Sequence, residues 1–411
     1  MKSLINSLGI EVKEEIKTIQ NTFLVTLKST NLPFISFGKG FSKEDALNSA
    51  YGEMLERVLT RNFLENYYIN NLYKDATIKD FLNPTLKKLY QIDKLDKEDL
   101  IDFNSDSFEI LSIPFLEKGS NQKVYFPINL IQNLYASNGM AFHKNLLQAY
   151  KNAKSEIIER YVKYKVIYYA LPLPKVSNPL NSKNFQVYDA TLGGKYPVMA
   201  VSYIKDGKII LSFGCDLDQE KAIKKAYLEI AQKEFIANGN ITDDIYAVRD
   251  EFNLERHFES LDGDIHINFF KKPLFKKAKW DFYSFDVFNK KEYFRIYKLN
   301  NHFAIQVIIP SISEVYSIED MKYFNINYPK FERDIILNYQ KYPTKEVINT
   351  INLLGNQEIG SYIGVIFKEP LTKEKLKKII LNKKPLPPFS QEYLNLKTLS
   401  KTLNQKVKNE I

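Results

Sequence analysis

The chain has little of several features that mark particular classes of protein. It has a single cysteine, Cys215, among 411 residues, so it cannot form an internal disulfide or a cysteine-based zinc site, and a reducing compartment is expected. No stretch reaches the roughly 18 uncharged apolar residues of a membrane span. Residues 1–17 lack an apolar core of signal-peptide length. These absences exclude a disulfide scaffold and predict a cytoplasmic protein without a membrane partner.

Common motifs for nucleotides and metals are also missing. The sequence has neither a Walker-type phosphate loop nor a dinucleotide glycine fingerprint. No two of the histidines have metal-ligand spacing; they are His143, His257, His266 and His302. We interpret Cys215, next to Gly214, as a small buried residue rather than a nucleophile. Any nucleotide or metal site must therefore be of another kind.

The composition is that of a soluble globular protein, with 44% hydrophobic and 26% charged residues. The net charge is +9, and much of the excess comes from lysines within residues 271–279 and 373–408. A nucleic-acid surface would need such lysines gathered on one face with aromatics between them. Lysines on strand edges and a basic amphipathic tail explain the pattern equally well. We favour that interpretation, so nucleic acid is not an expected partner.

Strand-like and helix-like segments alternate along the chain. This order predicts the α/β (α+β) class, with internally repeated strand, glycine-turn and helix units around mixed sheets. Residues 73–120 are expected to form a connecting insertion, and residues 321–411 a basic helical region broken by prolines at 385–389. A glycine pair at 193–194 predicts a hairpin. Strands are expected at residues 23–28, 33–37, 123–126, 185–189, 198–204, 208–213 and 303–309, and long helices at 43–68, 145–169 and 219–238.

The three long helices share one spacing of alanine and acidic residues. An alanine is followed seven residues later by a glutamate and ten residues later by a second glutamate or a glutamine, and glycine-containing turns are expected at Gly40, Gly139 and Gly214, before each helix. The sets are Ala46, Glu53, Glu56 and Arg57; Ala149, Glu156, Glu159 and Arg160; and Ala222, Glu229 and Gln232.

This spacing has an electrostatic consequence. Positions i, i+3 and i+7 lie on one face of a helix, and here that face also carries the alanine expected to pack closely. Burying ionised carboxylates without cations is costly. Two arginines leave five glutamates under-compensated, and a magnesium ion with oxygen ligands, which usually brings a phosphate with it, would supply the missing charge. A single such string is more often a solvated face with local ion pairs; the repetition favours a buried site.

These residues resemble the signature of the YcaO family. The likeness comprises Gly38-Lys39-Gly40, Ser49-x-x-x-Glu53-x-x-Glu56-Arg57, Ser137-Asn138-Gly139 with Glu156-x-x-Glu159-Arg160, and Glu229-x-x-Gln232. It extends from about residue 38 to residue 310. Connecting stretches at 125–135, 188–194 and 310–320 resemble the stand-alone subfamily linked to β-methylthiolation of a ribosomal protein.

The resemblance implies a YcaO-like ATP-binding domain over residues 1–320, with ATP and Mg²⁺ as cofactors. It also implies that a peptide backbone amide is activated by phosphorylation. Charge that develops on the transferred phosphoryl group would be stabilised by metal ions and arginine. By position, the metal ligands would be Glu53, Glu56, Glu156, Glu159 and Glu229, and the nucleotide contacts Ser49, Glu53, Arg57, Ser137, Asn138, Glu156, Arg160 and Lys225.

The resemblance also implies partners: a peptide or ribosomal protein as substrate and a radical-SAM methylthiotransferase, with a homodimer left open. Some positions depart from the family pattern. Ala141, Lys144 and Gln148 stand where relatives usually carry polar nucleotide contacts, and Lys225 replaces an expected arginine. Two hypotheses follow: a cyclodehydratase-like ATP-dependent enzyme or its accessory relative, and a non-catalytic binding protein with a degenerate nucleotide site.

Overall fold

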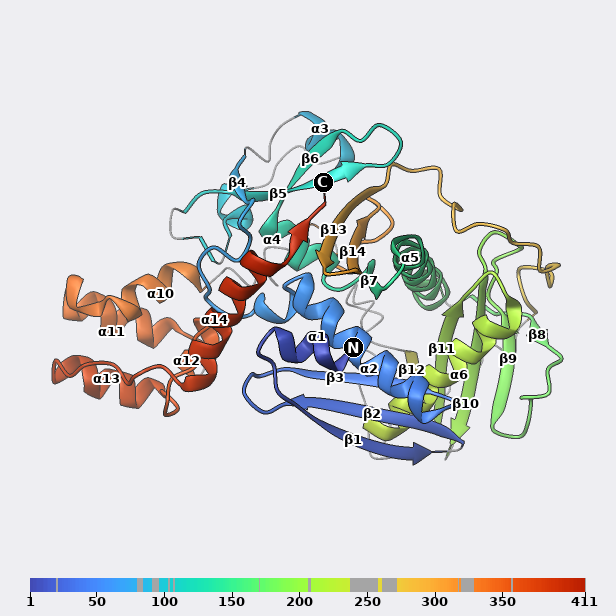
Figure 1. Ribbon diagram of the computed structural model, residues 1–411, viewed down its shortest axis with the longest axis horizontal. Helices are drawn as coiled ribbons and strands as arrows, with labels where there is room; N and C mark the ends of the chain where they lie inside the picture. Colours follow the sequence, from blue (N-terminus) through green and yellow to red (C-terminus); the bar gives the residue numbers. More distant parts are fainter. Residues whose placement is uncertain are drawn as a thin grey trace.

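The computed structural model describes residues 1–19, 21–79, 84–90, 96–102, 104–105, 108–169, 171–205, 208–236, 258–260, 272–316, 318, 329–355 and 358–410, with the backbone alone at 168, 204–205, 208–210, 232–236 and 258–260. Three β-sheets, each accompanied by a long helix, make up most of it (Figure 1). This arrangement confirms the predicted class. The predicted domain boundary at residue 320 and the insertion at 73–120 stay predictions.

The first sheet is antiparallel, in the order β1-β2-β3, and is covered by helix α2 (Lys43–Leu59). Ser42 caps α2 by accepting a hydrogen bond from the backbone N–H of Asp45. The helix ends at Leu59, earlier than the predicted end at residue 68. The reason is local: Arg61 has φ of +68°, which no right-handed helix can contain. The strands are β1 (Val12–Ile19), β2 (Thr22–Ser29) and β3 (Ile35–Gly40).

The second sheet has the order β12-β11-β10-β9-β8, and helix α6 (Gln219–Ile236) packs on β10 and β11. The chain turns between β9 and β10 through Gly193 and Gly194, both with positive φ. Met199 pairs with Asp189 across this connection, which confirms the predicted hairpin. The strands are β8 (Lys175–Val176), β9 (Phe185–Asp189), β10 (Val198–Lys205), β11 (Lys208–Cys215) and β12 (Phe258–Ser260).

The third sheet has the order β4-β5-β13-β14-β7, with β6 and β15 paired to β5 and β13. Helix α5 (Leu146–Tyr168) packs on β14 and β7. All strand pairings among the described residues are antiparallel, so the expectation of mixed sheets is wrong; several neighbours are joined by hairpins, which allow only that direction. The strands are β4 (Thr77–Ile78), β5 (Leu111–Glu117), β6 (Lys123–Pro127), β7 (Met140–His143), β13 (Tyr293–Leu299), β14 (His302–Ile308) and β15 (Lys408–Asn409).

Shorter helices complete these layers. Helix α1 covers Lys2–Ser7, α3 Pro84–Tyr90 and α4 Ile128–Leu130, and the single turns η1, η2 and η3 cover Asn62–Leu64, Lys97–Leu100 and Ile131–Tyr135. The C-terminal part contains α10 (Lys330–Leu337), η4 (Tyr339–Lys341), α11 (Thr344–Leu353), α12 (Ile359–Tyr362), α13 (Lys373–Leu381) and α14 (Gln391–Lys406). The proline-rich residues 385–389 separate α13 from α14, as predicted.

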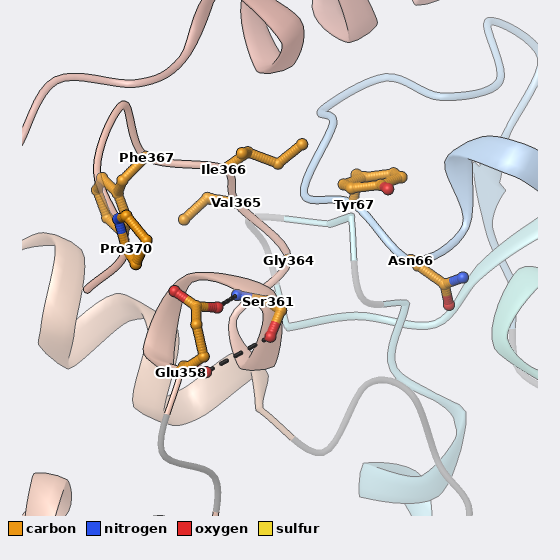
Figure 2. A pocket seen from close by; sticks show the side chains of 9 residues that line it. All are labelled: Asn66, Tyr67, Glu358, Ser361, Gly364, Val365, Ile366, Phe367 and Pro370. Carbon is orange, nitrogen blue, oxygen red and sulfur yellow. Dashed lines mark hydrogen bonds between the residues drawn. The ribbon is translucent and has the colours of Figure 1, made fainter. Parts of the chain in front are cut away.

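The C-terminal helices pack back onto the first part of the chain. Tyr393 of α14 donates its hydroxyl to the carbonyl oxygen of Tyr68, and Asn395 donates to the carbonyl oxygen of Asn31 at 3.0 Å. A cavity of about 340 Å³ lies at this junction; Figure 2 shows Tyr67 on one side and Ile366 on the other. The C-terminal region is therefore attached to the rest of the fold by side-chain contacts as well as by β15.

Candidate nucleotide and metal site

The three helices that carry the repeated glutamates lie against strands through their alanines. Ala46, Ala149 and Ala222 are fully buried. A Cβ atom on Gly38 would lie 2.1 Å from the carbonyl oxygen of Ala46, and one on Gly214 would lie 2.1 Å from that of Ala222. Only glycine fits at such distances, because real Cβ atoms never approach so closely. The backbone of each strand therefore touches its helix directly.

The glycines of the first and third units do not form the turns that the sequence predicted. Gly38 and Gly40 belong to β3 and Gly214 to β11, so their role is close packing rather than chain reversal. Gly139 does lie in a turn, with φ of +78°. In the second unit, strand β7 lies between this glycine and α5. The expected order of strand, turn and helix did not include that strand. The second unit thus differs from the first and third.

Backbone N–H groups hold three of the glutamate side chains. Each carboxylate accepts one hydrogen bond from a strand or a turn that precedes one of the helices, which fixes its orientation and stabilises its ionised form. The pairs are Glu53 with Phe37 at 3.0 Å, Glu156 with Gly139 at 3.1 Å, and Glu159 with Cys215 at 3.1 Å.

Three cationic side chains contact the same group of carboxylates. Lys39, between the two glycines of β3, forms an ion pair with Glu229 of α6 and so links the first and third units. The other two pairs lie within single helices: Arg160 Nη2 with Glu156 Oε1 at 2.9 Å in α5, and Arg57 Nε with Glu56 Oε1 at 3.6 Å in α2.

The pKa values indicate that these cations do not balance the carboxylates. Burial raises the pKa of Glu56 to about 8; Arg57 opposes this shift, and the negative charges of Glu156 and Glu53 add to it. Burial and the nearby charges of Glu229 and Glu156 raise the pKa of Glu159 to about 7. Burial also raises the pKa of Glu53. Carboxylates from all three helices therefore lie close enough to repel one another, and the cations beside them do not offset the cost of burial.

A hard cation fits this donor set, because carboxylate oxygens are the protein ligands that Mg²⁺ prefers. Within the described part of the chain, no three His, Cys, Asp or Glu side chains are arranged to hold a metal ion by themselves. Magnesium commonly shares its coordination between one or two carboxylates and substrate phosphates. The cluster thus suits magnesium that arrives with a phosphate chain rather than a closed protein cage.

The other predicted nucleotide contacts occupy different surroundings. Ser49 is exposed on α2. Ser137 is buried and receives a hydrogen bond from Arg160 at 3.5 Å. Asn138 is fully buried and donates to the carbonyl oxygen of Ser313 at 2.7 Å. Lys225 donates to the carbonyl oxygen of Cys215 at 2.8 Å. The roles of these residues stay predictions, and the side chain of Gln232 lies outside the described part.

Sequence reasoning missed two residues. Lys39 was noted only as part of Gly-Lys-Gly, although a lysine between two glycines packed on a helix can only point away from that helix. Lys154 of α5 is buried, with 1% of its side chain exposed, and it pairs with Glu292, far along the chain. No local pattern indicates this burial.

Other predictions can be compared with the structure directly. Cys215 is buried and free, as expected, and burial raises the pKa of its thiol. The lysines at 276, 277 and 279 are exposed, but on an irregular segment rather than a strand edge. His257 and His266 lie outside the described residues, whereas His143 accepts a hydrogen bond from the N–H of Asn145 at 2.9 Å. No helix in the described ranges is long and apolar enough to cross a membrane.

Residues 37–286, more than half of the chain, match the family model of YcaO cyclodehydratase, ATP- and Mg²⁺-binding. The chain belongs to the YcaO family. The matched range includes β3, α2, α5 and α6, the elements that carry the carboxylates.

Two curated proteins and one solved structure are similar to this YcaO protein. It is 26% identical to the ribosomal protein S12 methylthiotransferase accessory factor YcaO of Escherichia coli K12, over 88% of this chain and 72% of that protein. It is 28% identical to an uncharacterized protein of Haemophilus influenzae, over 81% and 67%. YcaO from Methanopyrus kandleri bound with AMPPCP and Mg²⁺ shares the fold, with a TM-score of 0.53, 15% identity and coverage of 76% and 88%.

Proposed function

We propose that this YcaO protein binds Mg-ATP at the carboxylate cluster of α2, α5 and α6 and activates a peptide backbone amide by phosphorylation. The observation that carries the proposal is the meeting of carboxylates from three helices in a place where burial disfavours their ionised forms: the pKa of Glu56 is raised to about 8 and that of Glu159 to about 7. Such an arrangement is costly unless a cation offsets it. A family relative in complex with AMPPCP and Mg²⁺ supports the identity of the ligands.

The chain's own residues would have distinct tasks. Glu53, Glu56, Glu156, Glu159 and Glu229 would hold the metal, and bound Mg-ATP would supply an electrophilic phosphoryl group whose charge the metal spreads. Backbone N–H groups keep three of the carboxylates oriented before any ligand arrives. This preorganisation lowers the cost of binding, since fewer side chains must be ordered.

The guanidinium groups of Arg57 and Arg160 would approach the phosphate chain. Both are about one-sixth exposed and already contact a glutamate of their own helix. Bidentate donors of this kind suit phosphate oxygens better than lysine does. In the absence of the ligand, Glu56 and Glu159 would hold protons near neutral pH and release them when a cation binds.

Calorimetry with Mg-ATP tests the proposal. Glu156→Gln should weaken binding about 10- to 100-fold, because it removes a ligand whose orientation Gly139 fixes. The matched control is Glu44→Gln, in the exposed first turn of α2, which should leave affinity unchanged. Equal effects of the two substitutions would contradict the assigned site.

A second function has its own supporting observation. Lys225, which replaces an expected arginine, pairs with Asp216 at 3.0 Å, while Lys144 and Gln148 are exposed. A protein with the YcaO fold that binds partners without turnover would explain these departures. Absence of Mg-ATP binding at millimolar concentration would favour this alternative.

We also propose that this protein, like its Escherichia coli relative, assists a methylthiotransferase that modifies ribosomal protein S12. The similarity over 88% of the chain supports this role. Mass spectrometry of that ribosomal protein from cells with and without this chain is the test. An unchanged extent of methylthiolation would contradict the accessory role while leaving the Mg-ATP site untouched.

A further inference from the structure

A cavity of about 450 Å³ lies away from the carboxylate cluster, between α3, the start of β13 and the turn that follows β14. None of its lining residues belongs to α2, α5 or α6. Its volume falls within the range of small-molecule sites, roughly 300–1,000 Å³. The cavity is therefore large enough for an organic ligand and separate from the proposed ATP site.

The charged residues that line this cavity are all lysines: Lys88, Lys290 and Lys291. Lys291 is neutralised by Glu117, with Nζ 2.9 Å from Oε1. Lys88 and Lys290 form no ion pair with any residue in the ranges that the structure describes. Two ammonium groups without an ion-pair partner among the described residues favour an anion at the cavity.

Three uncharged polar side chains add hydrogen-bonding capacity. Thr85, Asn289 and Ser311 line the cavity, and their side chains form no hydrogen bond within the described part of the protein. Ser311 is held in place from its backbone: its φ is +70°, and its N–H donates to the buried carboxylate of Glu314 at 2.7 Å. A residue kept in this unfavourable conformation is often part of a functional turn.

Apolar groups form the remaining wall, from Leu89, Tyr293 and Pro310. Tyr293 is fully buried and donates its hydroxyl to Glu117 at 3.4 Å. A ligand that fills the cavity must therefore combine a charged group for the lysines with an apolar or aromatic portion. Inorganic phosphate alone would leave this wall uncovered.

We propose that the cavity binds the phosphate group of a small organic phosphate monoester. Two available ammonium groups match the two negative charges of such a group near neutral pH, and hydroxyl and amide donors complement its oxygens. The turn at Ser311 continues to Ser313, whose carbonyl oxygen accepts a hydrogen bond from Asn138 at 2.7 Å. A bound ligand would thus contact the same turn that supports the segment before Gly139.

Titration calorimetry with phenyl phosphate in EDTA tests the proposal, because chelation removes the Mg²⁺ through which the proposed ATP site would hold a phosphate. Wild-type protein is expected to bind it saturably at millimolar concentration. Lys88→Gln combined with Lys290→Gln should weaken binding at least about tenfold. The matched control is Lys87→Gln combined with Lys277→Gln, which removes equal charge from exposed lysines outside the cavity and should change affinity less than about twofold.

The outcomes distinguish the possible ligands. Equal weakening in both double variants would overturn the cavity as the site, since it would indicate diffuse attraction to a basic surface. Equal affinity for phenyl phosphate and the dicarboxylate phthalate would overturn the choice of a phosphate. Absence of saturable binding would overturn the proposal as a whole. Thermal melting of each variant verifies folding, and Ser311→Ala, which removes one donor without changing charge, should weaken binding about threefold.

Discussion

Helix α5 carries two ionic clusters with opposite electrostatic balance. On one side, Lys154 forms ion pairs with Glu292 and Asp286. On another, Glu156 and Glu159 join the carboxylates of α2 and α6. The clusters are separated by a single residue along the helix, so the same element supports both.

The first cluster is balanced. Lys154 is 1% exposed and Glu292 5%, and Lys118 adds a second cation 3.3 Å from Glu292. Hydrogen bonds from Lys118 and Lys154 lower the pKa of Asp286 to about 2. This cluster attaches the irregular segment that precedes β13 to α5; Figure 1 shows this segment passing close to that helix.

The second cluster has five carboxylates around three cations. There the pKa values of Glu53, Glu56 and Glu159 are raised instead of lowered. Side chains of the protein itself neutralise the charge of Lys154 on α5, whereas they do not neutralise the glutamates of the same helix. Buried charges on this helix therefore have two different roles. The balanced cluster stabilises the fold, and the unbalanced one suits an external cation.

The largest effect is expected from removing a charge from the balanced cluster. Lys154→Met leaves Glu292 and Asp286 without their buried partner, which should lower the free energy of unfolding by about 3–5 kcal/mol. Urea denaturation measures it. Lys151→Met, on the exposed face of the same helix, should change stability by less than about 0.5 kcal/mol. A loss below about 1 kcal/mol at Lys154 would show that the pair is not a structural one.

A smaller effect on stability is expected from removing a negative charge from the second cluster. The pKa of Glu56 is about 8 in the folded protein and ordinary in the unfolded chain, so its ionisation lowers metal-free stability progressively as pH rises from about 4.5 to 8. Glu56→Gln should therefore be more stable than the wild type at pH 8.5, by about 2 kcal/mol, and similar at pH 4.5. Thermal unfolding across this range in EDTA measures it; parallel pH profiles would contradict the assignment.

The number of protons released on binding of Mg-ATP reports the protonation state of the second cluster. Glu56 and Glu159 must lose their protons when Mg-ATP binds, so roughly one to two protons should be released at pH 7. Affinity should then rise about ten- to a hundredfold per pH unit near pH 7, or about 1.4 kcal/mol per unit for each proton released. Calorimetry in buffers of different ionisation enthalpy detects the release. Heats that do not depend on the buffer would show that the carboxylates are already ionised.

The smallest effects distinguish two lysines near the second cluster. Lys39→Met removes the cation that contacts Glu229 and should lower stability by about 1–2 kcal/mol at pH 8. The loss should be smaller at pH 5, where the neighbouring Glu159 holds its proton. Lys225→Met, whose side chain is 43% exposed and pairs with Asp216, should cost less than about 1 kcal/mol. Urea denaturation of the two variants compares these losses of unfolding free energy. A larger loss at Lys225 than at Lys39 would contradict the role of Lys39.

Much of the candidate site was predictable from spacing alone. Alanine followed by glutamate seven residues later indicated which face of each helix is packed, and Ala46, Ala149 and Ala222 are buried as expected. The cap at Ser42 indicated where α2 begins. These features are local, because helix periodicity and capping depend only on residues within a few positions.

The failures share a physical cause. Gly40 and Gly214 were interpreted as turn residues, but they are needed because a helix approaches the strand backbone. The partner of Lys154 lies 138 positions away, at Glu292. Neither the approach of a helix nor the partner of a buried charge is encoded in nearby residues, so no local pattern could indicate them.

The sequence by itself determined which helices form, which face of each carries carboxylates, and that these carboxylates outnumber the nearby arginines. Only the tertiary structure decided that carboxylates from α2, α5 and α6 lie close enough to raise one another's pKa values, and that Lys39 rather than an arginine links α6 to the first sheet. The reason is that Coulomb interactions depend on separation in space and on burial, and both are set by how sheets and helices pack.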